Sequence, residues 1–190
     1  ADTVTNDGTI TAGPVADGSN AIIFTGSYAG GGGTLSGNVT TNPVICFRGA
    51  STTIGTFTHN DDSVVFDGGG NQTFAPGGSA YAAVTVNKTT GTFTVNTNAL
   101  SCTSLTITDS DGCTFSTAVT APVLTLTATT GTIAFTNNLT VATTFSNTGG
   151  SFDVNLYGTT TQMPGATFGT TGTVSLGNGG NTLTFGGGFT

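Results

Sequence analysis

A repeat of about twenty residues in the second half of the chain constrains its fold more than any other feature. Glycines in turn-forming stretches recur at Gly91, Gly112, Gly131, Gly150 and Gly172, with spacings of 21, 19, 19 and 22 residues. Glycine adopts the positive φ of a tight turn more easily than any other residue. Turns this close together leave room only for short strands between them.

Short stretches of alternating apolar and polar residues flank these turns. Before the turn, an apolar-Thr-apolar triplet recurs at one offset in residues 84–86, 105–107 and 124–126. A second alternating stretch follows the turn at 92–95, 113–115, 132–135, 151–154 and 173–176. Such alternation predicts strands with one buried and one exposed face.

Two all-β folds are compatible with this repeat. In a parallel β-solenoid with coils of about 20 residues, the triplets of successive coils stack directly on one another. In a β-sandwich or jelly roll, consecutive strands pair as hairpins. The sandwich gives no reason for one triplet to recur at one offset, which favours the solenoid.

We therefore expect a single elongated all-β domain over residues 1–190. Residues 81–190 carry the regular repeats, whereas residues 1–80 are expected to form less regular coils or a cap. Within the latter, the Gly-rich stretch 67–80 is expected to be a loop-like insertion.

Composition narrows the functions that this fold could serve. Of the 190 residues, 45 are Thr and 31 are Gly, only 6% are charged, and Glu is absent. Thr and Gly are poor helix formers, which excludes a helical protein. One Lys and one Arg against nine Asp cannot build a basic face for nucleic acid. No apolar run approaches the ~18 residues of a membrane span, so we expect no transmembrane helix. We also expect no cofactor.

The repeats resemble those of a known class of protein. The stretches GTFTHNDDSVVFDGGGNQTF, AAVTVNKTTGTFTV, SLTITDSDGCTF and VLTLTATTGTIAFTNNLTV are similar to strand repeats of secreted microbial β-solenoid proteins. That class comprises surface adhesins, haemagglutinin-like filaments and autotransporter-passenger-like exoproteins. The resemblance covers roughly residues 55–190 and implies an extracellular, elongated, non-catalytic protein.

The opening at Ala1, without Met or an apolar signal core, is interpreted as a secreted protein whose signal has been removed.

Residues suited to catalysis are few. His59 is the one histidine, and Asp61, Asp62, Asp67 and Arg48 are the charged residues near it in the sequence. A hydrolytic triad or a carboxylate pair needs a fixed geometry, which nothing in this spacing supplies. The sequence therefore predicts that the protein is not an enzyme.

Two pairs of residues have a spacing that suggests a ligand or a cross-link. Asp109 and Asp111 resemble the opening of a calcium loop, but no later acidic residue completes it, so we expect a solvated turn and no metal. Cys102 and Cys113 could form a disulfide across a narrow coil, leaving Cys46 unbridged or paired with either. The alternative is that these cysteines are small buried apolar residues.

Four N-glycosylation sequons begin at Asn38, Asn71, Asn87 and Asn138. A chain this rich in Thr contains sequons by chance. Asn87 and Asn138 could instead lie in turns or stack as a polar ladder.

The outward residues of the triplets predict a Thr grid. Its members are Thr85, Thr106, Thr125 and Thr144 in one column, with Thr108 and Thr127 in a second. Spacings of about 4.7–4.9 Å between coils and ~6.6 Å along the strand are expected. This grid looks like the ice-binding face of β-solenoid antifreeze proteins. The alternative is that Thr is simply well suited to an exposed strand face.

The leading functional hypothesis is a structural one. Strand-like stretches without charged gatekeepers lie near both ends of the chain, at Thr3, Val4 and Thr5 and at Thr182, Leu183, Thr184 and Phe185. Open strand edges pair readily with another chain. We therefore expect a secreted subunit of an extracellular filament or surface appendage, whose partners are copies of itself stacked head-to-tail. The alternatives are an adhesin or carbohydrate-binding fragment that contacts surface glycans, and an ice-binding solenoid.

Overall fold

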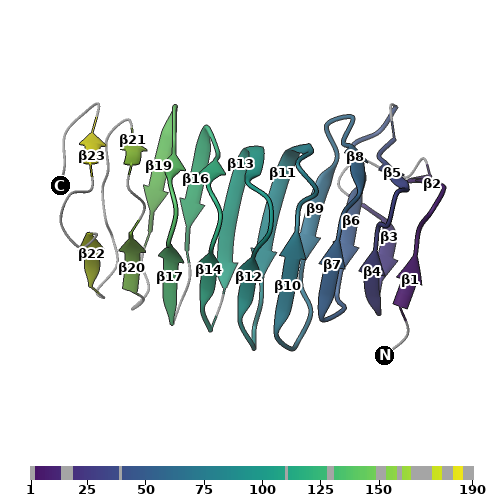
Figure 1. Cartoon of the computed structure of the whole chain (residues 1–190), viewed down its shortest axis with the longest axis horizontal. Helices are drawn as coiled ribbons and strands as arrows, with labels where there is room; N and C mark the ends of the chain where they lie inside the picture. Colours follow the sequence, from purple (N-terminus) through teal and green to yellow (C-terminus); the bar gives the residue numbers. More distant parts are fainter. Residues whose placement is uncertain are drawn as a thin grey trace.

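The computed structural model describes residues 3–13, 19–38, 40–109, 111–127, 131–148, 153–157, 160–163, 173–176 and 182–185. These residues form a parallel β-solenoid with coils of about 21 residues and no helix (Figure 1). The solenoid prediction is confirmed, because the strands pair in parallel from coil to coil and not as hairpins. Among the described residues, no helix is long and apolar enough to cross a membrane.

Three sheets run along the rod. Sheet A consists of β1 (Thr3–Thr5), β4 (Ser27–Ala29), β7 (Ser51–Thr53), β10 (Gln72–Ala75), β12 (Phe93–Val95), β14 (Cys113–Phe115), β17 (Thr132–Phe135), β20 (Asp153–Leu156) and β22 (Val174–Leu176). Sheet B is shorter and consists of β2 (Thr9–Thr11), β5 (Thr34–Ser36) and β8 (Thr56–Thr58).

Sheet C has eleven described strands. They are β3 (Asn20–Phe24), β6 (Val44–Phe47), β9 (Ser63–Phe66), β11 (Ala80–Asn87), β13 (Leu100–Asp109), β15 (Val119–Thr120), β16 (Val123–Leu126), β18 (Leu139–Thr140), β19 (Thr144–Asn147), β21 (Thr160–Met163) and β23 (Thr182–Phe185). The strands β11 and β13 are long and continuous. The next coil has two shorter strands in their place, β15 and β16, and both pair with β13.

The predicted triplets stack in register inside the rod. Val84 on β11 pairs with Leu105 on β13, which pairs with Leu124 on β16. All three side chains are buried. The last residues of the triplets form a second buried column in the same way. Like residues therefore lie above like residues, which explains why one triplet recurs.

Stacked aromatic rings also contribute to this core, both in the N-terminal coils and further along the rod. The ring of Phe47 stacks on Phe24 at 5.1 Å and on Phe66 at 5.5 Å between centroids. Further along, Phe115 stacks on Phe135 at 4.8 Å. Aromatic pairs at these distances add about 0.5–1.5 kcal/mol each beyond the area they bury.

The turn glycines are required by the closeness of neighbouring coils. Gly91 and Gly131 have φ angles of 76° and 84°. A Cβ atom on Gly91 would lie 2.6 Å from the carbonyl carbon of Gly70 in the preceding coil. Gly150 and Gly172 lie outside the described residues.

The N-terminal coils contribute strands to sheets A and C and form sheet B. The stretch 67–80, expected to be a loop-like insertion, contains β10. Phe74 on this strand is fully buried and pairs with Thr52 and Val95 of the neighbouring coils. Gln72 and Phe74 both point inward on this strand, which pairs in register with the coils on both sides.

Candidate functional site

The predicted Thr column lies on the outer face of sheet C. Thr85, Thr106 and Thr125 occupy one register position on β11, β13 and β16, and each is partly exposed. Thr144 does not continue this column, as it pairs with Val123. The next residue in the column is Ser146 on β19, which pairs with Thr125. The prediction for Thr144 was wrong because this coil is longer than the one before it.

The second predicted column is less regular. A register shift follows Val86, so that Asn87 pairs with Asp109 and not with Thr108. The Thr108 hydroxyl donates to the Asn87 side-chain oxygen at 3.0 Å. The Thr127 hydroxyl donates to the carbonyl of Ile107 at 3.3 Å. These two hydroxyls therefore tie neighbouring coils together.

Sheet A carries a hydroxyl column that the sequence analysis missed. Ser51, Thr73, Thr94 and Thr114 are in register on its outer face, and Ala134 follows them. The signal was present, because Thr94 and Thr114 are the polar centres of the alternating stretches after the turn glycines. It was missed because the predicted grid drew only on the triplets that precede these glycines.

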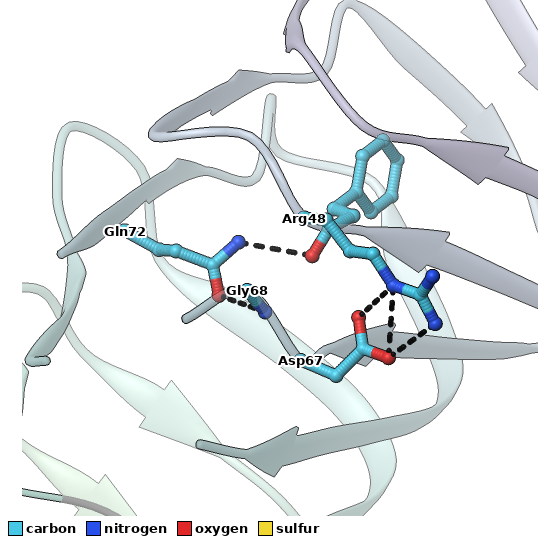
Figure 2. A network of polar contacts seen from close by, with 5 residues as sticks. Arg48, Asp67, Gly68 and Gln72 are labelled. Atoms are coloured by element: carbon cyan, nitrogen blue, oxygen red, sulfur yellow. Dashed lines mark hydrogen bonds and ion pairs between the residues drawn. The ribbon is translucent and has the colours of Figure 1, made fainter. Parts of the chain in front are cut away.

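The charged residues near His59 separate into two groups at opposite ends of β9. The Arg48 guanidinium forms a bidentate ion pair with Asp67 after the strand, with Nε 3.0 Å from Oδ1 and Nη2 2.9 Å from Oδ2 (Figure 2). His59 and Asp61 lie in the turn before the strand, where His59 Nδ1 accepts the backbone N–H of Asp61 at 2.9 Å. The described residues thus bring no triad together around His59.

Asp62 is a fully buried carboxyl group in this turn. Its Oδ2 accepts the backbone N–H of Asn38 at 2.7 Å, and Oδ1 has no hydrogen-bond partner in the described part of the chain. Burial raises the pKa of Asp62 to about 6. The preceding residues Asn60 and Asp61 have positive φ angles of 45° and 67°, so the turn is also strained.

Gln72 connects the turn after β9 to the coil before it. Its amide nitrogen donates to the carbonyls of Phe47 and Gly49, each at 2.9 Å. Its amide oxygen accepts the backbone N–H of Gly68 at 3.1 Å. The side chain is 2% exposed, so its hydrogen bonds with the protein replace those it would make with water.

Lys88 is fully buried beside Gln72. Its Nζ donates to the carbonyls of Gly68 at 2.5 Å and Gly70 at 2.6 Å, and to the Gln72 amide oxygen at 3.1 Å. Burial lowers the pKa of the Lys88 ammonium. Nothing in the sequence alone pointed to this cluster, since a lysine after a strand is usually solvated.

The candidate disulfide and metal residues lie as follows. Cys102 is on β13 in sheet C and Cys113 on β14 in sheet A, and both are buried thiols that form no disulfide. Burial raises the pKa of Cys102 to about 12. The Asp111 carboxylate accepts the backbone N–H of Gly91 at 2.9 Å and so joins two coils. No cluster of three potential metal ligands occurs in the part of the chain that the structure describes.

The four sequon asparagines differ in exposure. Asn71 and Asn87 are exposed, whereas Asn38 and Asn138 are partly buried. Asn38 donates through its amide to the carbonyl of Ala12 at 3.2 Å, so a glycan on this nitrogen would disturb a contact between coils.

The first and last described strands of sheet A lie at opposite ends of the rod (Figure 1). All three residues of β1 are exposed, and Val4 is 38% exposed although it stands in the inward column above Tyr28. At the other end, β22 pairs with β20 in sheet A and β23 pairs with β21 in sheet C.

Comparison of the chain with protein-family models found no match, and comparisons with curated proteins and with solved structures found none either.

Proposed function

We propose that the protein is a non-catalytic structural subunit of an extracellular filament or surface appendage, and that copies stack head-to-tail. The observation that carries this proposal is the exposure of β1: among the described residues it pairs with β4 alone, and Val4 occupies a core column and is nevertheless 38% exposed. Tyr28, the next residue in that column, is only 2% exposed.

The register supports stacking of unlike ends. Following the pairings along sheet A, Leu176 of β22 occupies the same column as Val4 of β1. A β22 strand placed beside β1 of a second copy would continue the parallel ladder with Leu176 and Val4 in register. Because the two ends differ, the contact is heterologous and propagates into a fibre.

The test compares a charge at the edge with the same charge in the middle of the rod. We expect the unmodified chain to form filaments by negative-stain imaging and to sediment as polymers. Val4→Asp should leave monomers, because it places a charge in the stacking column at a site already open to solvent. The control Thr114→Asp on the outer face of sheet A should assemble normally.

Deletion of residues 1–12 removes β1 and β2 and should also prevent assembly. If the unmodified chain is monomeric at high concentration and neither change alters its sedimentation, the filament function is wrong.

A second function, ice binding, is favoured by the in-register hydroxyls of Thr85, Thr106 and Thr125. We expect the double variant Thr106→Lys and Thr125→Lys to lose thermal hysteresis with little change in melting temperature. The matched double variant Thr94→Lys and Thr114→Lys on sheet A should keep it. Ice binding is excluded if the unmodified protein shows no hysteresis.

A further inference from the structure

The turn between β9 and β10 directs three oxygen atoms toward one buried point. They are the backbone carbonyls of Gly68 and Gly70 and the side-chain oxygen of Gln72, at 2.5, 2.6 and 3.1 Å from Nζ of Lys88. All three are uncharged oxygens, and the point they surround is occupied by a positive charge from the following coil.

Contacts that do not involve Lys88 hold this arrangement in place. The Gln72 amide is fixed by bonds to Phe47, Gly49 and Gly68, which determine where its oxygen points. Gly68 has no room for a side chain, because a Cβ atom there would collide with the Arg48 carbonyl and with Gln72. The oxygens are therefore positioned by the turn itself.

The chemistry of these oxygens selects a monovalent cation. Carbonyl oxygens replace the hydration shell of K⁺ in protein sites, whereas Ca²⁺ and Mg²⁺ are bound mainly through carboxylates. The carboxylates of Asp67 and Asp111 act on the Lys88 ammonium through their charge, but its hydrogen bonds go to the three uncharged oxygens.

We infer that the turn 67–72 is a monovalent-cation site that the chain fills with its own Lys88 ammonium, and that it takes K⁺ or a small alkylammonium when this group is removed. The site is a cross-link between two coils that needs no metal as long as Lys88 is present. This inference is independent of the proposed filament.

Nitrogen-15 labelling of lysine tests the occupied site directly, because Lys88 is the one lysine of the chain. We expect a single ammonium signal by NMR that exchanges slowly with water in the folded protein. An ammonium signal that exchanges as fast as free lysine would overturn the inference.

The variant Lys88→Ala tests the vacated site. It should lower the melting temperature by roughly 5–10 °C, because three oxygens lose the hydrogen bond that the Lys88 ammonium donates. At constant ionic strength, K⁺, ammonium or methylammonium should restore at least half of this loss, and the bulky tetramethylammonium should restore none.

The double variant Lys88→Ala and Gln72→Leu is the matched control, and it should gain nothing from methylammonium over tetramethylammonium. Equal responses to both ions in the single variant would contradict the inference. If Lys88→Ala fails to fold, two measurements still test the inference. One is the NMR measurement on the unmodified protein. The other is the conservative variant Lys88→Arg, which should have a lower melting temperature because its guanidinium is larger than the ammonium.

Discussion

At the scale of single residues, buried polar side chains replace backbone ladders where the coils turn. Gln72 and Lys88 join the coils on either side of the turn 67–72. Asn6 does the same nearer the N-terminus, donating to the Tyr28 hydroxyl at 2.9 Å and to the Thr34 carbonyl at 3.0 Å. Backbone groups at corners still need partners, and side-chain amides supply them.

Asp62 differs from these residues, since burial opposes its charge and one of its oxygens has no partner among the described residues. Its pKa is about 6 in the folded protein, against 3.8 for the ordinary group. The folded state therefore binds the proton more tightly, so stability falls as the pH rises between these two values. His59 and Asp61 are the titratable groups nearest to it in this turn.

We expect Asp62→Asn to stabilise the protein by about 2 kcal/mol more at pH 7.5 than at pH 4, because the variant has no buried charge to form. Urea unfolding of both proteins at the two pH values measures this difference. Asp61→Asn, at an exposed neighbouring position, is the control and should show little change. An equal effect of Asp62→Asn at both pH values would contradict the assignment.

At the scale of strands and columns, the repeats in the sequence predicted the stacked core. They did not predict contacts that a single side chain makes with a neighbouring coil. The triplets placed Val84, Leu105 and Leu124 in one interior column, and the pairing is as expected. Thr144 was assigned to the wrong column because the coils differ in length. The positions of the turn glycines alone do not determine the length of each coil. The Lys88 cluster was missed because its acceptors come from another coil.

The column that contains Val86, Ile107 and Leu126 ends at Asn147 on β19. Asn147 is 3% exposed, and neither polar atom of its amide has a hydrogen-bond partner among the residues that the structure describes. Asn147→Leu should therefore stabilise the protein by about 1–3 kcal/mol, as measured by chemical unfolding. The control Ser146→Leu, on the outward side of the same strand, should not stabilise it. A loss of stability in Asn147→Leu would mean that the amide is paired in solution.

At the scale of the whole molecule, the hydrogen bonds of the strands run along the axis of the rod. Each coil is bonded to the coil before it and the coil after it, and the core is a set of columns with the same direction. The coils of such a rod stay together as long as the strands of each neighbouring pair of coils remain hydrogen-bonded. Local opening therefore needs the loss of several ladder bonds at once.

This organisation predicts resistance to proteases that cleave after Lys or Arg, because the chain offers them only Arg48 and Lys88. Lys88 is buried, and Arg48 is held by Asp67 while its backbone N–H donates to the Phe24 carbonyl at 2.8 Å. A protease needs an extended segment in its active site, so cleavage must await opening of a coil.

We expect trypsin to leave the folded protein intact for hours and to cut the urea-unfolded chain rapidly at both sites, as followed by mass spectrometry. Asp67→Asn should speed cleavage after Arg48 and leave Lys88 protected, since it frees the guanidinium without opening the Lys88 site. Rapid cleavage after Lys88 in the folded, unmodified protein would show that the coil carrying it opens independently of its neighbours.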